Sequence, residues 1–393
     1  MKILWVKTDY LHPTTRGGQI RTLEMLRRLR QRHEVHYVCF AEAGDAVGPA
    51  GSREYCAFAY PVPHTIPEKT SPAFLVQLAG GLFSPKPVAV SRFASRKMLR
   101  AIAELQKRQR FDSVVCDFLF PAPNIPDLAS CVLFQHNVES VIWQRRLENA
   151  AGPIRRAYLR LQAERMLKYE GAVCRAVRKV IAVSAADAQT MRRLYGVENV
   201  AAIATGVDLD YFAPPAAGQP KTDLVFVGSM DWMPNTDGAL WFTKEVLPLI
   251  RRSRPDCSLA IVGRKPTAAV VELGTDPRIT VTGTVDDVRP WLFGSTAAIV
   301  PLRMGGGTRL KIYEAMAAGI PVVSTTIGAE GLEVSTGRDI LIADSPAEFA
   351  GRCLALLDSS AERARIAAAA LQMVAARGSW EAVARDFERL LTS

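Results

Sequence analysis

The sequence predicts an α/β protein built from two Rossmann-like layers, one in each half of the chain. Three observations support this fold class. Short apolar segments of strand length alternate with amphipathic helical segments in both halves. The chain has 393 residues, which is too many for one ordinary hydrophobic core. A segment rich in Pro, Ala and Gly, APPAAGQPK (213–221), separates the two halves.

The first half opens with a strand–helix–strand unit. Residues 2–6 are an apolar strand, an Arg-rich amphipathic helix follows at about 19–32, and 34–40 return as a strand. Two strands joined by a helix imply a parallel sheet. Further elements expected in this half are strands at 113–117, 131–135 and 179–183 and a long helix at about 153–178.

The second half repeats the alternation and gives the domain boundaries. We expect residues 1–213 to form the N-terminal domain, 214–221 a linker and 222–376 the C-terminal domain. Residues 377–393 form a last helix, whose Trp380, Val383, Phe387 and Leu390 share one face that we expect to pack back on the N-terminal domain. The expected elements of the second half are strands at 224–228, 259–263, 279–283, 297–301 and 321–324 and helices near 236–252 and 308–318.

Composition excludes several classes of protein. Hydrophobic residues make up 49% and charged residues 22%, which is typical of a globular protein and not of a disordered one. Seven scattered cysteines without a CxxC pair argue against a disulfide framework or a structural zinc site. No apolar run reaches the ~18 residues of a membrane span, and the start is too short for a signal peptide. We therefore expect a cytoplasmic protein.

The net charge of +10 is unevenly distributed. Residues 1–213 carry +11 and the remainder −1. Such a basic half attracts nucleic acid, anionic lipid or a phosphorylated ligand, unless the arginines only solvate helix faces. Aromatic and basic residues do not interleave as in nucleic-acid-binding motifs, so no nucleic acid partner is expected.

The most informative segment is LRMGGGTRLKIYEAMAAGIPVVS (302–324), in which glycines precede a helix. This order suits a nucleoside diphosphate, because glycines and a helix N-terminus approach phosphates closely and a carboxylate one turn later accepts bonds from ribose hydroxyls. Arg309 and Lys311 oppose the helix dipole at this end, a conflict that an anionic ligand removes. The alternatives are a Thr308 N-cap and an exposed Lys311–Glu314 ion pair. The candidate diphosphate-binding residues here are Gly305, Gly306, Gly307, Thr308, Arg309, Lys311 and Glu314.

Other candidates follow strands, at the edge where open α/β sheets bind ligands. Gly17 and Gly18 lie between the first strand and the first helix, and His136 follows the strand at 131–135. Arg264 and Lys265 follow the strand at 259–263, where they contact phosphate or belong to a solvated loop. No GxGxxG follows a strand and no GxxxxGK[ST] occurs, which disfavours dinucleotide oxidoreductases and P-loop enzymes.

Taken together, these residues resemble GT-B-fold retaining glycosyltransferases of the family 4 group. The resemblance covers nearly the whole chain, and its finer features are similar to bacterial exopolysaccharide and exosortase-associated sugar transferases. The motifs that carry it are QHNVES (135–140), TGVDLDYF (205–212), FVGSMDWMPNTDGALWF (226–242), VTGTVDDVRPWL (281–292) and EAMAAGIPVVST (314–325).

The resemblance implies two Rossmann-like domains facing across a cleft. A nucleotide-diphosphate sugar would bind the second domain, and a glycan or polyprenyl-diphosphate-linked acceptor the basic first domain. Glu314 would bind the donor ribose and His136 the donor sugar, so both are candidate catalytic residues. The Gly17–Gly18 loop would close over the diphosphate. Transfer would need no metal and no cofactor, with the leaving diphosphate helping to deprotonate the acceptor.

The chain departs from the family pattern at two places. Gly306 stands where many members carry the first glutamate of E-x7-E, and Ser229 and Met230 replace an Arg and a Lys. Two other functions share this fold or ligand, a UDP-sugar epimerase and a non-catalytic protein that binds nucleotide sugars. The segment 73–102, apolar and then basic, suits contact with an anionic membrane at the inner face of the plasma membrane, or an ordinary helical hairpin packed on the sheet.

Overall fold

The computed structural model of the chain consists of two compact units, each described here by itself. The structure describes residues 1–14, 17–42, 44–66, 84–148, 150, 152–213, 221–304 and 309–393. Unit 1 comprises Met1–Ile203 and Val383–Ser393, and unit 2 comprises Ala204–Ala382. The predicted linker, 214–221, lies outside the described residues except for Lys221, so the predicted domain boundaries stay predictions.

Unit 1 is built on a parallel sheet of seven described strands in the order β3-β2-β1-β4-β5-β6-β7. The strands predicted at its centre are confirmed, and the parallel register places Ile3 beside both Val35 and Ser113. The edge strands β3 and β7 were not predicted. The bounds are β1 Lys2–Val6, β2 Glu34–Ala41, β3 Phe58–Pro63, β4 Ser113–Asp117, β5 Cys131–Gln135, β6 Lys179–Ala182 and β7 Val200–Ala202.

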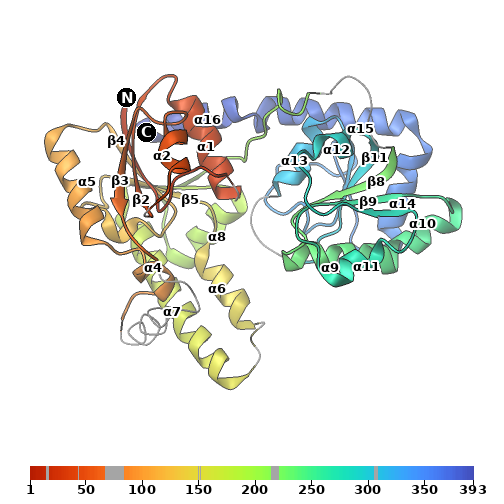
Figure 1. The fold of residues 1–393 in the computed structure, drawn as a ribbon, viewed down its shortest axis with the longest axis horizontal. Helices are drawn as coiled ribbons and strands as arrows, with labels where there is room; N and C mark the ends of the chain where they lie inside the picture. The colour runs from red at the N-terminus through yellow and green to blue at the C-terminus, as the bar shows by residue number, and fades with distance from the viewer. Residues whose placement is uncertain are drawn as a thin grey trace. The chain divides into compact units, whose positions relative to one another are not determined.

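Helices cover this sheet, and two of them extend beyond it. α6 and α7 pack along each other as a helical hairpin that projects away from the strands (Figure 1). α1 begins at Gly17, two residues earlier than the sequence suggested. The bounds are α1 Gly17–Leu29, α2 Val47–Ser52, α4 Val88–Ser91, α5 Arg96–Arg108, α6 Glu139–Glu148, α7 Pro153–Ala176 and α8 Ala185–Tyr195, with a short 3₁₀ turn at Ala122–Asn124.

The central strands of unit 1 are buried on both faces. Leu4 and Val6 point into one hydrophobic core, while Trp5 between them points to the opposite face. There the last helix, α16 (Trp380–Thr392), places the fully buried Phe387 5.5 Å from the Trp5 ring and 5.0 Å from the Phe134 ring. An aromatic cluster therefore fixes the end of the chain on unit 1.

Unit 2 has a parallel sheet of six described strands in the order β10-β9-β8-β11-β12-β13. In Figure 1, α9 and α11 lie on one side of the sheet and α13 and α15 on the other. The strand bounds are β8 Thr222–Val227, β9 Leu259–Val262, β10 Ile279–Val281, β11 Ser295–Val300, β12 Val322–Ser324 and β13 Leu341–Ile342. The helix bounds are α9 Met233–Trp241, α10 Leu247–Ser253, α11 Ala268–Leu273, α12 Arg289–Phe293, α13 Leu310–Ala317, α14 Pro346–Asp358 and α15 Ser360–Met373.

The helix predicted near 236–252 is not continuous. A π-helical stretch, Phe242–Val246, separates α9 from α10. Pro248 follows in the first turn of α10, and because proline has no N–H it cannot continue the regular hydrogen-bond ladder. A second π-helical stretch, Val374–Gly378, lies between α15 and α16.

Each sheet has one place where the strand order reverses, between β1 and β4 in unit 1 and between β8 and β11 in unit 2. Open parallel sheets bind their ligands beside the carboxyl ends of the strands at such switch points. The two polar clusters described below lie at these two positions.

The basic helix α5 does not present its apolar side to a membrane. Met98 and Ile102 are fully buried in the core of unit 1, whereas Arg96, Lys97 and Arg100 are exposed. For the described part of 73–102 the packed alternative is therefore correct, and 73–83 lies outside the described residues. No described helix combines the length and hydropathy that a membrane span requires.

Candidate functional site

A cationic cradle lies at the switch point of unit 2. Lys311 on α13 directs its Nζ toward the start of α9, where it donates to Asn235 Oδ1 at 2.7 Å. A Cβ at Gly228 would lie 2.6 Å from both the Lys311 Nζ and the Asn235 Nδ2. Only glycine therefore leaves room for the lysine at the end of β8. The amide is fixed in turn, since Asn235 Nδ2 donates to the Ser229 carbonyl at 2.8 Å.

Electrostatics in the cradle favours an anionic ligand. Burial and the charge of Arg309 lower the pKa of Lys311 to about 7, and Glu314 only partly opposes this. Burial likewise raises the pKa of Glu314. Lys311 and Glu314 are both partly buried, so the alternative of an exposed surface ion pair is wrong. A bound anion would restore the full charge of Lys311.

Other predicted residues border the cradle. Arg309 precedes α13, is 4% exposed, and lies 5.6 Å from the ring of the half-exposed Trp232. Arg264, which is exposed, donates through Nε to Ser229 Oγ at 2.8 Å. Lys265 is exposed beside it and has a positive φ of 50°. Arg264 therefore contacts Ser229 in the loop after β8, the residue whose carbonyl also accepts from Asn235.

The glycine-rich loop that precedes α13 is not part of the geometry described above. Gly305, Gly306, Gly307 and Thr308 lie outside the described residues, and with them the position of the missing first glutamate of E-x7-E. Their roles stay predictions.

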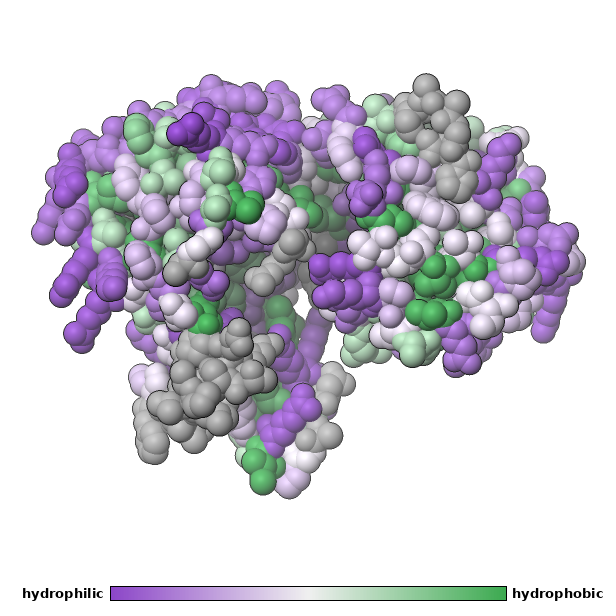
Figure 2. Space-filling model, viewed as in Figure 1, coloured by the Kyte–Doolittle hydropathy of each residue, from purple (hydrophilic) through white to green (hydrophobic). Residues whose placement is uncertain are grey.

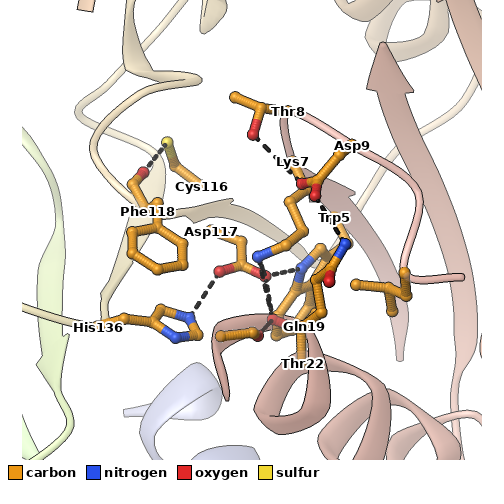
Figure 3. A network of polar contacts seen from close by, with 12 residues as sticks. Trp5, Lys7, Thr8, Asp9, Gln19, Thr22, Cys116, Asp117, Phe118 and His136 are labelled. Atoms are coloured by element: carbon orange, nitrogen blue, oxygen red, sulfur yellow. Dashed lines mark hydrogen bonds and ion pairs between the residues drawn. The ribbon is translucent and has the colours of Figure 1, made fainter. Parts of the chain in front are cut away.

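A second polar cluster lies at the switch point of unit 1 (Figure 3). Asp117 ends β4, is fully buried, and accepts four side-chain contacts. Burial alone would raise its pKa, but Lys7 and His136 outweigh burial and hold the pKa of Asp117 well below its usual range. The contacts are Lys7 Nζ at 3.0 Å, Trp5 Nε1 at 2.9 Å, Thr22 Oγ1 at 2.7 Å and His136 Nε2 at 2.7 Å.

Asp117 determines which nitrogen of His136 carries the proton. An ionised carboxylate only accepts hydrogen bonds, so Nε2 must be protonated. Burial lowers the pKa of His136 to about 4 despite the opposing charge of Asp117, and the ring is therefore neutral at pH 7. Nδ1 is then a buried acceptor, with no hydrogen-bond partner among the residues that the structure describes. Such an acceptor suits a hydroxyl group of a ligand.

Phe118 packs against the face of the His136 ring, and Gly18 lies next to both side chains. The Phe118 ring stacks on the imidazole with 4.0 Å between centroids, and Phe118 has a positive φ of 73°, which is strained for a bulky residue. A Cβ at Gly18 would lie 3.0 Å from the Phe118 ring and 3.6 Å from His136 Nδ1. Gly17 and Gly18 thus belong to the first turn of α1, not to a loop before it.

Sequence reasoning missed several residues of these clusters. Lys7 and Asp117 come directly after or at the end of buried strands, a position that could have singled them out. Asn235 offered no such signal, because it reaches the cradle from inside α9. The structure brings together Arg309, Lys311 and Glu314 in unit 2, and Gly18 and His136 in unit 1.

Comparison with known families decides the classification. Residues 15–211, half of the chain, match Glycosyltransferase Family 4, and residues 221–359 match Glycosyl transferases group 1. The chain belongs to glycosyltransferase family 4. This membership confirms the predicted enzyme class, a glycosyltransferase.

Curated relatives of this family 4 chain are only partly covered. It is 28% identical to D-inositol 3-phosphate glycosyltransferase 2 of Catenulispora acidiphila, over 55% of this chain and 56% of the relative. It is also 28% identical to an uncharacterized 44.6 kDa protein in the cps region of Klebsiella pneumoniae, over 33% and 35%. The chain thus spans a third to just over half the length of these relatives.

Solved structures share the whole fold. Anabaena HepE in complex with UDP superposes with a TM-score of 0.69 at 14% identity, covering 100% of both chains. WaaG, a glycosyltransferase involved in lipopolysaccharide biosynthesis, gives 0.65 at 14% identity, again over 100% of both chains. These likenesses confirm the GT-B fold of two Rossmann-like domains.

Proposed function

We propose that this family 4 protein transfers a sugar from a nucleotide-diphosphate donor to a glycan or lipid-linked acceptor. The observation that carries the proposal is the position of Lys311. Its ammonium group lies at the switch point of unit 2, against Gly228, and its hydrogen-bond partner there is the neutral amide of Asn235. A diphosphate is the anion that this geometry and the family membership favour.

The relatives support the donor and suggest a biological setting. HepE was solved with UDP bound, which supports a nucleoside diphosphate as a ligand of this chain. WaaG takes part in lipopolysaccharide synthesis, and the Klebsiella relative comes from a cps region. These relatives support the proposal of a role in bacterial exopolysaccharide or cell-surface glycan synthesis.

The proposed reaction retains configuration at the sugar and uses no metal ion or cofactor. Glu314 would accept hydrogen bonds from the donor ribose, while Arg309, Lys311 and the glycine-rich loop neutralise the diphosphate. His136 would accept a hydrogen bond from a sugar hydroxyl through Nδ1. With a pKa of about 4, its imidazole is too weak a base to deprotonate the acceptor at neutral pH. The leaving diphosphate would take that proton.

A membrane-bound acceptor remains part of the proposal, in a cytoplasmic location at the inner face of the membrane. Because the apolar side of α5 is buried, contact would be electrostatic. The α6–α7 hairpin adds exposed arginines and Ile154, which is 87% exposed. Figure 2 shows apolar atoms at the far end of this hairpin. Anionic lipids attract such basic residues by about 1 kcal/mol each.

One experiment separates the proposed transferase from its alternatives. Thermal stabilisation would be measured with a panel of UDP-, GDP-, ADP- and CMP-sugars, followed by release of the nucleoside diphosphate in the presence of bacterial lipid extract and EDTA. We expect one donor to stabilise the protein and acceptor-dependent release to occur. Sugar isomerisation without an acceptor would indicate an epimerase, and stabilisation without turnover a non-catalytic binding protein.

Glu314→Ala tests the residue assignment in the same assay. Glu362→Ala serves as the matched control, because Glu362 lies on α15 of the same unit and forms an exposed helical ion pair with Arg365. Loss of turnover in Glu314→Ala but not in the control is expected. Full activity in Glu314→Ala would remove this residue from the site and leave the proposed reaction intact.

A further inference from the structure

A buried carboxylate lies behind the His136 segment and takes no part in the site described so far. Glu170 on α7 is fully buried. Its Oε1 accepts from Gln135 Nε2 at 2.6 Å and from the Glu139 N–H at 3.0 Å. Its Oε2 accepts from the Ser140 N–H at 2.7 Å and from the Tyr195 hydroxyl at 2.6 Å. One carboxylate therefore holds four donors.

Three of these donors lie on either side of His136 along the chain. Gln135 is the last residue of β5 and directly precedes the histidine, while Glu139 and Ser140 open α6 three and four residues after it. The first N–H groups of a helix have no partner inside the helix, and a carboxylate at this end also interacts favourably with the helix dipole. Glu170 thus fixes the chain before and after His136 at once.

The charge on Glu170 is consistent with its partners. The two backbone N–H groups can only donate toward it, and Gln135 Nε2 and the Tyr195 hydroxyl donate as well, which suits an ionised carboxylate. Burial and the charge of Glu170 raise the pKa of the neighbouring Glu139 to about 7. Burial also raises the pKa of Glu170, and the hydrogen bonds that it accepts from Tyr195, Ser140, Glu139 and Gln135 oppose this rise.

We propose that Glu170 is a positioning residue for His136, set on the α6–α7 hairpin and acting through the residues on either side of the histidine. Asp117 and Phe118 fix the imidazole ring itself, and Glu170 fixes the backbone that carries it. The inference rests on the proposed function, because His136 is assigned there to the sugar. It makes the hairpin a part of the catalytic architecture as well as a surface feature.

Glu170→Gln tests the proposal with little change in shape. The glutamine amide offers one acceptor oxygen and an NH2 group, and this NH2 group must face N–H donors. The hydrogen bonds that hold the chain on either side of His136 are therefore weakened. We expect kcat to fall by about 10- to 100-fold, the effect of a misplacement near 1 Å. The affinity for the free nucleoside diphosphate, which carries no sugar for His136 to contact, should change little because the cradle is in unit 2. Glu164→Gln, on the exposed side of the same helix, is the matched control and should leave kcat unchanged.

A double-mutant cycle shows whether the effect passes through His136. In the His136→Ala background, Glu170→Gln should change kcat by less than about threefold, because the group that it positions is gone. Equal losses of kcat in both backgrounds would overturn the proposal and indicate a general role in folding. Tyr195→Phe removes one donor but keeps the carboxylate, and should lower kcat in the same direction by a smaller factor.

An imidazole ¹⁵N spectrum tests positioning without any enzymatic assay. His136 should appear as the neutral Nε2–H form at pH 6, and Glu170→Gln should shift its ring nitrogens while Glu164→Gln does not. An unmoved His136 signal in Glu170→Gln would overturn the proposal. If the wild-type protein transfers no sugar, the proposed function fails while this spectrum still decides whether Glu170 positions the ring.

Discussion

Asp117→Asn is the substitution whose effect the structure specifies best. Asparagine keeps the shape of the side chain but removes its charge and replaces one acceptor oxygen with an NH2 group. The Lys7 side chain is only 3% exposed and the Asp117 side chain 0%, so water cannot compensate the lysine once its counter-charge is lost. Trp5, Thr22 and His136 also donate to this carboxylate.

Breaking a buried ion pair by removing one partner costs about 3–5 kcal/mol. We expect Asp117→Asn to lower the free energy of opening of unit 1 by this amount. Lys7→Met in the same background should recover about 1–3 kcal/mol, because it removes the stranded charge. Glu104→Gln is the control. Glu104 on α5 of the same unit is 64% exposed in its ion pair with Arg108, and such surface pairs contribute about 0–1 kcal/mol.

The assay must report on unit 1 alone, because a protein with two units need not unfold in one step. Amide hydrogen exchange in peptides that cover β1 and β4 gives the free energy of opening at these strands. The pKa of Asp117 is lowered in the folded state, so its contribution is present above the unfolded pKa of about 3.9 and is lost as the pH falls further. The difference between wild type and Asp117→Asn should therefore be constant from pH 5 to 7 and shrink below pH 4.

The reasoning is refuted if Asp117→Asn opens β1 and β4 no more easily than Glu104→Gln does. It is also refuted if Lys7→Met lowers the free energy of opening further in the Asp117→Asn background, since removing a lysine without its counter-charge should raise it.

Three further predictions concern the cradle, the last helix and the stacking of Phe118 on His136, which we call the histidine clamp. The affinity for UDP should fall about tenfold per pH unit above pH 7, since free Lys311 with a pKa of about 7 must be protonated to bind the anion, and calorimetry of Lys311→Met should show weaker binding without this slope. Phe387→Ala should lower the stability of unit 1 by about 3–5 kcal/mol in hydrogen exchange, whereas Arg389→Ala, exposed on the same helix, should change it by less than about 0.5 kcal/mol. Gly18→Ala should push Phe118 from the imidazole and reduce the ring-current shift of the His136 protons in an NMR spectrum, and an unchanged shift would contradict the clamp.

Much of the fold could be predicted because it follows from periodicity. Runs such as ILWV (3–6) and LAIV (259–262) are apolar throughout because parallel strands are buried on both faces. The edge strand β3 was missed, because its prolines and half-exposed residues carry no such pattern. The break before α10 was also missed, although Pro248 marks it.

The site was predictable only where its functional residues are close together in the sequence. Lys311 and Glu314 stand three residues apart on α13 and Arg309 directly precedes this helix, so spacing alone brings them together. Asp117 and His136 are 19 positions apart and meet only because β4 and β5 are adjacent in the sheet. Glu170 reaches the His136 segment from the middle of α7, which no local pattern indicates.

The central claim is that unit 2 binds a nucleoside diphosphate through Lys311, and calorimetric titration of the whole protein with UDP, GDP and ADP tests it most directly. Lys107→Met, an exposed lysine of α5, is the control for Lys311→Met. A charged hydrogen bond contributes about 1.5–3 kcal/mol, so one of the three ligands should bind wild type and Lys107→Met alike, and Lys311→Met about 10- to 150-fold more weakly. If none of them binds, or if Lys311→Met binds as tightly as wild type, the cradle is not the donor site.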